Sequence, residues 1–342
     1  MQKKIKYEVN IDIANKTKQE MQKTLQSNNA NIISKPNSFA ALYDFNFPNY
    51  KEPVLVMKTE EPGTKQLLAA KYGSLETIAY DMINHLVNDC IVMGARPLAV
   101  QDAIICGKIV QEDVNKLVKA MSNACKEQGC NLVGGETSEQ PGVVEEGVYI
   151  LTSSIVGLVE KSEIIDGTNI KKGDIVLAVA SNGIHTNGIT MVRSIIKEFP
   201  NVLNIKINNE TFIQNILRPH MCYYNIVKDL FKGGSIKGMA HITGGGISEN
   251  LNRILPPTLN AEIDLQKYKV LEVFKIIKKF SNASDEEMLR VFNMGVGLAI
   301  VTNENDVNST ISHIKNNGGD CYEIGRIVTG SGEVLHNNDI VW

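Results

Sequence analysis

The stretch AHITGGGISENLNRILP, residues 240–256, places a strand, a turn and a helix directly after one another. An apolar run ends in three glycines, Gly244, Gly245 and Gly246, and apolar residues at helical spacing follow at once. Such a turn directs free backbone N–H groups and the positive end of a helix towards an anion. We therefore expect an α/β unit with a phosphate or acyl-phosphate site at the glycines. The alternative is a plain strand-to-helix turn.

A second stretch, SNGIHTNGITMVR (181–193), repeats this arrangement. His185 stands before the turn formed by Asn187 and Gly188, as His241 stands before the three glycines. A lone histidine in such a position is more often a core residue than a catalyst, and this alternative stays open. Two glycine turns with histidines, one at each strand-to-helix junction, favour a functional role over chance.

Apolar runs and helical spacing alternate along the whole chain, which predicts the α/β (α+β) class. In the first half, strands are expected at 53–59, 97–104 and 148–160, and helices at 75–94 and 111–128. In the second half, strands are expected at 174–181, 237–243, 261–265, 295–301 and 322–328, and helices after Thr186, within 210–232, after Gly246, and at 271–280 and 304–316.

A charged, turn-rich segment, EKSEIIDGTNIKKGD (160–174), separates the two halves. A chain of 342 residues exceeds the usual size of one hydrophobic core. We therefore expect two mixed α/β domains, residues 1–168 and 169–342.

Composition excludes several classes of protein. Hydrophobic residues make up 43% and charged residues 21%, as in ordinary globular proteins. The net charge of −3 gives no basic field, so nucleic acid is not an expected partner. The six cysteines have no metal or redox spacing, and neither a signal peptide nor an apolar run of about 20 residues is present. We expect reduced thiols, no membrane partner and a cytoplasmic location.

Acidic residues gather on one predicted helix, TIAYDMINHLVNDCIVMGA (77–95). Asp81, His85, Asn88 and Asp89 recur at steps of three or four and share the face opposite its apolar stripe. Carboxylate and amide oxygens there suit a hard cation. The alternative is a solvated face. Asp102, in the next apolar strand, favours a functional role, because an isolated acid is costly to bury without a partner.

Two further stretches are typical of a site for a nucleotide with Mg²⁺. In EEPGTK (60–65), carboxylates precede Gly63-Thr64-Lys65, and a phosphate beside carboxylates needs a cation between them. In GGETSEQPG (134–142), which reads as a loop after a strand end, glycines permit close approach of a ligand. Each stretch alone also fits an ordinary turn.

Taken in order, EPGTK, VNDCIVMGARPL, GGETSEQPG, GIHTNGITMVR, HITGGGISENLNRILP and FNMGVGLAIV resemble the motif series of the aminoimidazole ribonucleotide synthetase (phosphoribosylformylglycinamidine cyclo-ligase) family. The likeness runs from about Val9 to Val328. It implies an N-terminal sheet that pairs with that of a second subunit in a dimeric barrel, and a C-terminal α/β domain. The active site would lie in the cleft between the two domains.

The resemblance also implies a reaction of purine biosynthesis. ATP would phosphorylate the formamide oxygen of formylglycinamidine ribonucleotide, and an amidine nitrogen would then close the imidazole ring. ATP and Mg²⁺ are the implied cofactors, a small ribonucleotide is the substrate, and a homodimer is the assembly.

Site residues carry over by motif. Nucleotide binding is expected of Thr64, Lys65, Asp81, Asn88, Asp89, Asp102, Gly134, Gly135, Glu136, Thr137, Gly244, Gly245 and Gly246. The implied metal ligands are Glu60, Asp89 and Glu136, and the implied catalytic residues are His185, His241 and Asn187.

The chain departs from the family pattern in four places. Glu60-Glu61-Pro62 stands where Asp-Gly-Val is usual, and Pro219-His220-Met221 stands for Pro-Thr-Arg. KPNSFAALYDF (35–45) replaces a double-glycine loop, and Ile150 replaces an acid. Two alternatives therefore stand beside the cyclo-ligase: a relative that activates a different amide or acid with ATP, and a catalytically silent ATP-binding scaffold.

Overall fold

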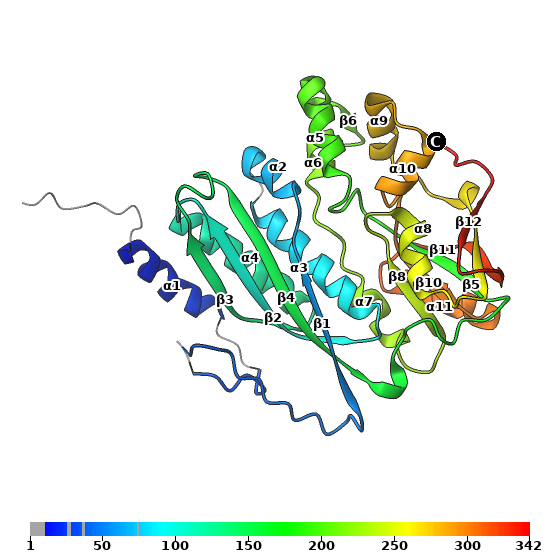
Figure 1. The fold of residues 1–342 in the computed structure, drawn as a ribbon, viewed down its shortest axis with the longest axis horizontal. Helices are drawn as coiled ribbons and strands as arrows, with labels where there is room; N and C mark the ends of the chain where they lie inside the picture. The colour runs from blue at the N-terminus through cyan, green and yellow to red at the C-terminus, as the bar shows by residue number, and fades with distance from the viewer. Residues whose placement is uncertain (1–10, 26–28, 36–37, 74) are drawn as a thin grey trace, which may run out of the picture.

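The computed structural model describes residues 11–25, 29–35, 38–73 and 75–342. It contains one larger mixed sheet in each half of the chain, with helices packed against both, which confirms the expected mixed α/β class (Figure 1). Residues 36–37 of the departure at 35–45, and Val9 at the start of the family likeness, lie outside the described residues. Among the described helices, none has the length and apolar character needed to span a membrane.

The N-terminal sheet has the strand order β1-β4-β2-β3. Its strands are β1 (Pro53–Glu60), β2 (Arg96–Cys106), β3 (Asn131–Glu139) and β4 (Tyr149–Glu160). Only β2 and β3 are parallel, and the chain passes from one to the other through a helix. The helices of this half are α1 (Ile11–Leu25), α2 (Lys65–Tyr72), α3 (Leu75–Ile91) and α4 (Gln111–Glu127).

Helix α3 lies between this sheet and the C-terminal half (Figure 1). Its neighbour α4 packs against it, and the apolar residues of both helices are buried on the sheet. The other face of the sheet carries apolar side chains in the open. On β1, whose side chains alternate between the two faces, Leu55 is 47% exposed and Met57 is 74% exposed.

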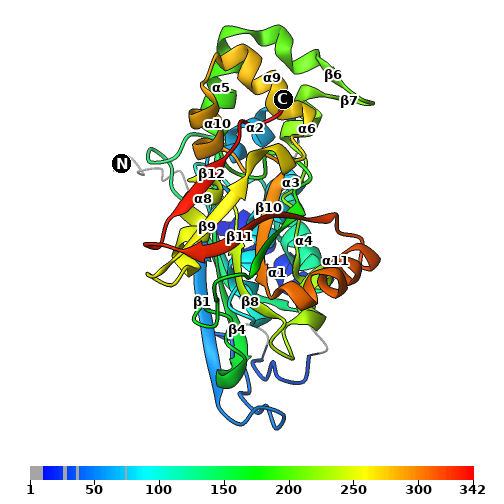
Figure 2. The same cartoon turned by 90° about the vertical axis from the view of Figure 1, so that its right-hand side faces the viewer.

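The C-terminal sheet has the order β12-β9-β11-β5-β10-β8, and only β12 and β9 are parallel (Figure 2). Its strands are β5 (Ile175–Ala180), β8 (Ile236–His241), β9 (Leu259–Asp264), β10 (Val296–Thr302), β11 (Cys321–Thr329) and β12 (Val334–Asn337), and a separate ribbon joins β6 (Lys206–Ile207) and β7 (Glu210–Thr211). The helices are α5 (Ile189–Glu198), α6 (Phe212–Ile216), α7 (Tyr224–Val227), α8 (Gly246–Leu251), α9 (Glu272–Ser281), α10 (Asp285–Val291) and α11 (Val307–Asn316), besides short 3₁₀ turns.

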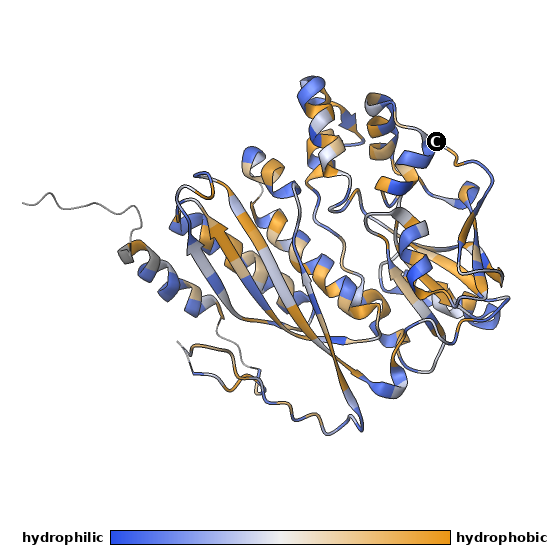
Figure 3. Ribbon diagram, in the orientation of Figure 1, coloured by the Kyte–Doolittle hydropathy of each residue, from blue (hydrophilic) through white to orange (hydrophobic). Residues whose placement is uncertain are grey.

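The centre of this second sheet is apolar (Figure 3). The seven residues of β10 are all buried, as are the first five of β5, because both strands are interior and covered on both faces. Both strands could be predicted from the sequence because they are continuous apolar runs.

Two expectations about turns were wrong. Residues 134–139 of the glycine-rich stretch are not a loop: β3 continues through Glu139, with Val133 as an extra residue in its pairing with β2. The helix expected from Thr186 begins at Ile189, because Gly188, in the left-handed conformation (φ 72°), still belongs to the turn. Helices α1, α2 and α10 and strands β6, β7 and β12 were not predicted.

Candidate functional site

A cleft of about 650 Å³ lies between the two halves. The first half contributes Lys58 and Glu60 from β1 and His85 and Asp89 from α3, while the second half contributes Asn187, His241, Gly244 and Arg253. Alternation along β1 explains the first pair, since residues two apart point to the same face of a strand. His85 and Asp89 are four residues apart on α3 and therefore lie one turn apart on the same face.

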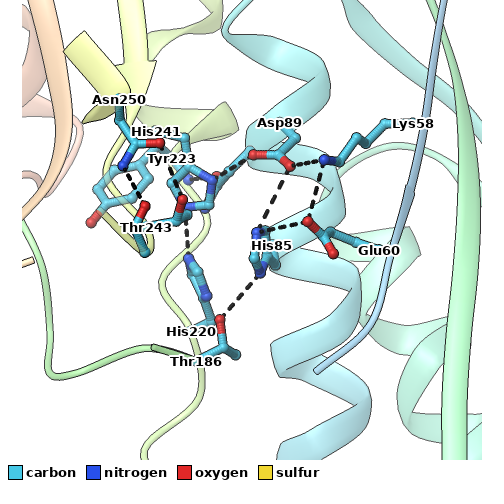
Figure 4. A network of polar contacts seen from close by, with 12 residues as sticks. Lys58, Glu60, His85, Asp89, Thr186, His220, Tyr223, His241, Thr243 and Asn250 are labelled. Atoms are coloured by element: carbon cyan, nitrogen blue, oxygen red, sulfur yellow. Dashed lines mark hydrogen bonds and ion pairs between the residues drawn. The ribbon is translucent and has the colours of Figure 1, made fainter. Parts of the chain in front are cut away.

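Asp89 is the centre of the polar network (Figure 4). Its Oδ1 accepts a hydrogen bond from Nδ1 of His241 at 2.7 Å, and its Oδ2 lies 3.1 Å from Nζ of Lys58. Burial alone would raise the pKa of Asp89, but the hydrogen bond and charge of His241, with His85 and Lys58, hold this pKa well below its usual range. Asp89 is therefore an anion at neutral pH.

Lys58 joins the two acids of the cleft. Its Nζ lies 3.2 Å from Oε1 of Glu60 as well as 3.1 Å from Asp89. Burial opposes the charge on Lys58, but the two carboxylates raise its pKa above the ordinary value. The carboxylates of Glu60 and Asp89 thus converge on one positive charge.

His85 contacts the same acids from the side of α3. Its Nε2 lies 3.5 Å from Oε1 of Glu60 and 3.8 Å from Oδ2 of Asp89, and its Nδ1 lies 3.1 Å from Oγ1 of Thr186. Burial, with the charge of His241, lowers the pKa of His85 to about 4 despite the neighbouring acids. The ring is therefore neutral at pH 7.

Two further histidines lie behind His241. Nε2 of His220 is 2.9 Å from Nε2 of His241, and the His220 ring stacks on that of His185 with 3.9 Å between ring centres. Burial lowers the pKa of both His185 and His220 well below the ordinary value, so both rings are neutral. Both ring nitrogens of His185 and Nδ1 of His220 have no hydrogen-bond partner among the described residues.

Lys65 and Asp81 form a fully buried ion pair away from the cleft. Nζ of Lys65 lies 2.8 Å from Oδ2 of Asp81 and donates to the carbonyl oxygen of Arg218, and the backbone N–H of His220 donates to Oδ1 of Asp81 at 2.7 Å. Burial raises the pKa of Asp81 to about 6, against the opposing effect of Lys65. These bonds fix the segment that carries His220.

Asn88, about two turns beyond Asp81 on α3, extends this junction. Its amide donates to the carbonyl oxygen of Met221 at 2.8 Å and accepts from the N–H of Tyr223 at 2.9 Å. The polar face of α3 is thus neither solvated nor a single cation site. One part of it holds the chain at 218–223, and His85 and Asp89 line the cleft. Nucleotide contacts of Lys65, Asp81 and Asn88 stay a prediction.

The glycine turn bonds mainly to protein. The N–H of Gly245 donates to the carbonyl oxygen of Arg290 at 2.9 Å, and that of Gly246 donates to the carbonyl oxygen of Thr243. At Gly246 (φ 61°) a Cβ would come within 1.8 Å of the Leu289 carbonyl oxygen, so no other residue fits. Two of the three N–H groups expected to bind an anion are therefore engaged, and Gly244 alone of the three lines the cleft.

A second, larger cavity of about 930 Å³ lies on the other face of the N-terminal sheet. It is lined by five of the predicted nucleotide-binding residues, together with residues of α1 and of the segment after it. The five are Asp102, Gly134, Gly135, Glu136 and Thr137. Lys18 and Lys35 line the same cavity and bring positive charge.

Asp102 is the buried acid of this cavity. It is 7% exposed, its Oδ2 has no partner among the described residues, and burial raises its pKa to about 7. Gly135 lies against it: a Cβ at Gly135 would stand 2.3 Å from both the carbonyl oxygen and Oδ1 of Asp102. The glycine thus permits the close approach of β3 to β2 at this point.

The predicted site residues therefore fall into separate groups. Glu60, Asp89, Asn187, His241 and Gly244 line the cleft, whereas Glu136 lies in the larger cavity. Glu60 and Glu136 stand on β1 and β3, the two edge strands of the N-terminal sheet, so the structure does not bring these two expected metal ligands together. Thr64, half-buried, directly precedes α2 and forms no side-chain cap bond there.

Sequence reasoning missed four residues of this region: Lys58, His85, His220 and Arg253. His85 was noted on the helix but given no role, although its spacing of four from Asp89 was a usable signal. His220 lies in the departure Pro219-His220-Met221, which marked the segment as unusual. No signal in the sequence distinguished Lys58 or Arg253 from other surface cations.

Comparison with known proteins agrees with this architecture. Residues 40–159 match the AIR synthase related protein N-terminal domain, and residues 171–337 match the corresponding C-terminal domain. The phosphoribosylformylglycinamidine cyclo-ligase of Carboxydothermus hydrogenoformans is 39% identical over 330 residues, which cover 96% of this chain and 95% of that protein. The enzyme of the same name from Staphylococcus epidermidis is 39% identical over 298 residues, 87% of each chain.

A solved structure, hydrogenase maturation protein HypE in complex with ATP, has the same fold. Its TM-score is 0.64 at 17% identity, over 88% of this chain and 84% of that one. Both domains and a near-complete match to curated enzymes lead to one conclusion: the chain belongs to the AIR synthase related family, among the phosphoribosylformylglycinamidine cyclo-ligases.

Proposed function

We propose that this protein uses ATP to cyclise formylglycinamidine ribonucleotide to aminoimidazole ribonucleotide in purine biosynthesis. The observation that carries the proposal is the 39% identity to a curated cyclo-ligase along 96% of the chain. The polar cleft between the halves, with its bonded pair of Asp89 and His241, supports it.

The reaction has two steps that balance. The formamide oxygen attacks the γ-phosphorus of ATP, and the bond to the bridging oxygen breaks to release ADP. An amidine nitrogen then attacks the formyl carbon, the carbon–oxygen bond breaks to release phosphate, and the attacking nitrogen loses a proton. The formamide nitrogen loses its own proton on activation, so one of these two protons leaves with the phosphate and the other passes to solvent. A proton shift from the methylene carbon to the remaining amidine nitrogen gives the aromatic aminoimidazole. Phosphorylation is needed because an amide oxygen is a poor leaving group whereas phosphate is a good one.

The cleft offers side chains for each requirement. Lys58 and Arg253 provide positive charge for the transferred phosphoryl group, which gathers negative charge in the reaction. His241, held by Asp89, is suited to accept the amidine proton. Asn187 lines the cleft, and its buried side-chain N–H₂ has no partner among the described residues, which suits it to donate to a bound substrate. His185 does not line the cleft, so it acts there only through the histidines in front of it.

The larger cavity is the proposed place for the nucleotide. Its volume of about 930 Å³ suits a ligand of this size, and Lys18 and Lys35 suit phosphates. Thr59 lines this cavity, while its neighbours Lys58 and Glu60 line the cleft. The two spaces therefore adjoin at the β1 edge of the sheet, where the phosphates of a bound nucleotide would extend towards the cleft.

Mg²⁺ is proposed to lie at Glu60 and Asp89. Carboxylate oxygens are the ligands that Mg²⁺ prefers, and these two already converge on one cation, the ammonium of Lys58. The ion would neutralise charge on the nucleotide phosphates. Glu61 is exposed where it lines the same cleft, and it is assigned to solvent or an outer shell.

Substitution of Glu60 or Glu61 by glutamine tests the proposed metal site. Glu60→Gln is expected to weaken Mg²⁺-dependent ATP use far more than Glu61→Gln, and excess Mg²⁺ should partly relieve the defect. The Mg²⁺ dependence of ADP formation measures both variants. Equal, small effects would remove Glu60 from the metal site.

Assembly and location belong to the same proposal. We expect a homodimer formed through the exposed face of the N-terminal sheet, where Leu55 and Met57 would otherwise remain in water. The cytoplasmic location expected from the sequence stays a prediction.

One incubation separates the candidate functions. The protein is mixed with formylglycinamidine ribonucleotide, ATP and Mg²⁺, and aminoimidazole ribonucleotide and ADP are followed together. Equal amounts of both products are the expected result. ADP formation without the imidazole, stimulated by some other amide or acid, would instead favour a relative with a different substrate. Absence of any ATP turnover would favour the silent scaffold.

A further inference from the structure

Three buried histidines meet behind the cleft: His185, His220 and His241. Each offers a ring nitrogen, and the three nitrogens lie within 4.8 Å of one another. They come from three separate parts of the second half, namely the turn after β5, the segment before α7 and the end of β8. We propose that they form a binding site for one divalent transition-metal ion of the Zn²⁺ type. This inference does not depend on the proposed cyclo-ligase activity.

The hydrogen bond between Asp89 and His241 prepares one ligand. Because a carboxylate only accepts, Nδ1 of His241 carries the hydrogen, and in the neutral ring Nε2 therefore presents a lone pair. A carboxylate that holds one ring nitrogen in this way is the usual partner of a metal-bound histidine. The lone pair of Nε2 points to His220, 2.9 Å away.

The spacing of the first two ligands is close to that of a zinc site. Two nitrogens on a tetrahedral Zn²⁺, each at about 2.0–2.1 Å, lie roughly 3.3 Å apart. The Nε2 atoms of His220 and His241 are 2.9 Å apart, so a shift of a few tenths of an ångström admits an ion in place of the shared hydrogen. Asp81, which holds the backbone N–H of His220 at 2.7 Å, fixes this ligand from behind.

His185 is the proposed third ligand. Its burial, its unpaired ring nitrogens and its left-handed backbone need an explanation. It is 1% exposed, neither ring nitrogen has a partner among the described residues, and its backbone is left-handed at φ 58°. Leaving buried polar atoms unpaired is unfavourable, and a left-handed residue with a side chain adds strain. A metal ion would satisfy one of these nitrogens. The ring, now stacked on His220, has to turn to aim its nitrogen at the ion.

A competing set, His85, Asp89 and His241, also has its donor atoms close together. It is less suited to an imidazole-bound ion, because both ring nitrogens of His85 already have partners and the ammonium of Lys58 lies 3.1 Å from Asp89. In the histidine trio, both ring nitrogens of His185 and Nδ1 of His220 have no hydrogen-bond partner among the described residues. Three protein ligands leave the fourth position of a tetrahedral ion for water or for a group in the cleft.

Cobalt provides the test, because Co²⁺ replaces Zn²⁺ and its visible absorption reports tetrahedral geometry with nitrogen ligands. The full chain is stripped with EDTA, dialysed and titrated with Co²⁺, and bound metal is counted by mass spectrometry. We expect one equivalent with an intense tetrahedral spectrum, and displacement of that spectrum by Zn²⁺. Binding of Co²⁺ with only a weak octahedral spectrum, or no binding, would overturn the proposal.

Matched variants identify the ligands. His185→Asn and His220→Asn should each abolish the tetrahedral spectrum, and Asp89→Asn should weaken Co²⁺ binding about 10–100-fold. His85→Asn should leave the spectrum in place. The opposite result, in which His85→Asn abolishes the spectrum and His185→Asn does not, assigns any ion to the competing set. Circular dichroism checks the fold of each variant, and the Zn²⁺-dependent rise in the unfolding temperature of the unaltered protein provides a readout without substitution.

Discussion

At the scale of single residues, Asp89 and His241 set the character of the cleft. Their 2.7 Å hydrogen bond places a fixed imidazole beside the proposed reacting groups, and Asp89 stays ionised through its neighbours. Replacing His241 with Ala removes the proton acceptor but leaves β8 intact. We expect turnover to fall by about 10²-fold or more, the usual scale for a positioned acid–base group.

The measurement for this variant is the rate of ring closure at saturating substrate, with circular dichroism to check folding. His336→Ala, at an exposed histidine of β12 that contacts Ser248 and does not line the cleft, serves as a control and should keep full activity. Full activity of His241→Ala would return His241 to the core-residue alternative that the sequence left open.

The raised pKa of the buried Asp102 carboxyl makes the free energy of unfolding depend on pH. Burial raises its pKa to about 7 in the folded protein, against an ordinary value of 3.8. Between these two values the unfolded chain has lost the proton that the folded chain keeps, so the free energy of unfolding falls as pH rises and levels off above about pH 7. Asp102→Asn cannot ionise and should lack this contribution.

Urea unfolding at pH 5 and pH 8 measures the effect. The stability of Asp102→Asn relative to the unaltered protein should rise between these pH values, by on the order of 2–3 kcal/mol. The same relative stability at both pH values would mean that Asp102 is ionised in the folded protein and has a partner in solution.

At the scale of elements, the interior strands were the elements that the sequence predicted best. Interior strands such as β5 and β10 are continuous apolar runs because both of their faces are covered. Helix α1 was missed because its apolar positions are few and its residues largely polar. The stretch at 134–139 was misread as a loop since its two glycines suit a bulged strand packed against Asp102 as well as a turn.

Only part of the site could be predicted from the sequence, for a different reason. Local spacing correctly grouped His85 with Asp89 on one face of α3, but it could not indicate that Asp81 and Asn88 hold a segment more than 130 residues away in the chain. Nor could spacing show that β1 separates two cavities. Such contacts depend on how the two halves dock, which periodicity along one element does not report.

The buried pair of Lys65 and Asp81 lies where α2, α3 and the segment 218–223 meet. Its contribution to the stability of this junction can be measured. Lys65→Met leaves the Asp81 carboxylate buried beside an apolar chain, and removing one partner of a buried pair costs about 3–5 kcal/mol. We expect a loss of that size in urea unfolding. Lys71→Met, on the exposed side of α2, is the matched control and should change stability by less than about 0.5 kcal/mol.

Equal unfolding midpoints for Lys65→Met and Lys71→Met would show that the pair contributes nothing to the docking of the halves. Addition of Asp81→Leu to Lys65→Met provides a second check. Removing the unpaired carboxylate should recover part of the loss, although the N–H of His220 then loses its acceptor.

At the scale of the whole molecule, the N-terminal sheet has one face covered by α3 and α4. On its other face, which lines the larger cavity together with α1, the large apolar side chains of β1 are in water. Leu55 and Met57 stand on β1, which is also an edge strand with open hydrogen-bonding groups. Sheets with such edges and faces associate unless something covers them. A second copy of the chain would cover both features through a symmetric contact.

We therefore expect light scattering at micromolar concentration to give twice the chain mass of 37.7 kDa. The double variant Leu55→Glu, Met57→Glu places two like charges on each side of the symmetric contact, where burying them unpaired is costly, and should be monomeric. Val341→Glu is the matched control: Val341 is also apolar and 58% exposed, but it lies at the C-terminal end, away from the N-terminal sheet, and its substitution should leave the dimer intact. A stable monomer of the unaltered chain would contradict the prediction. Dissociation by Val341→Glu, with the double variant still dimeric, would move the contact to the C-terminal half, because the charge then disrupts a different surface.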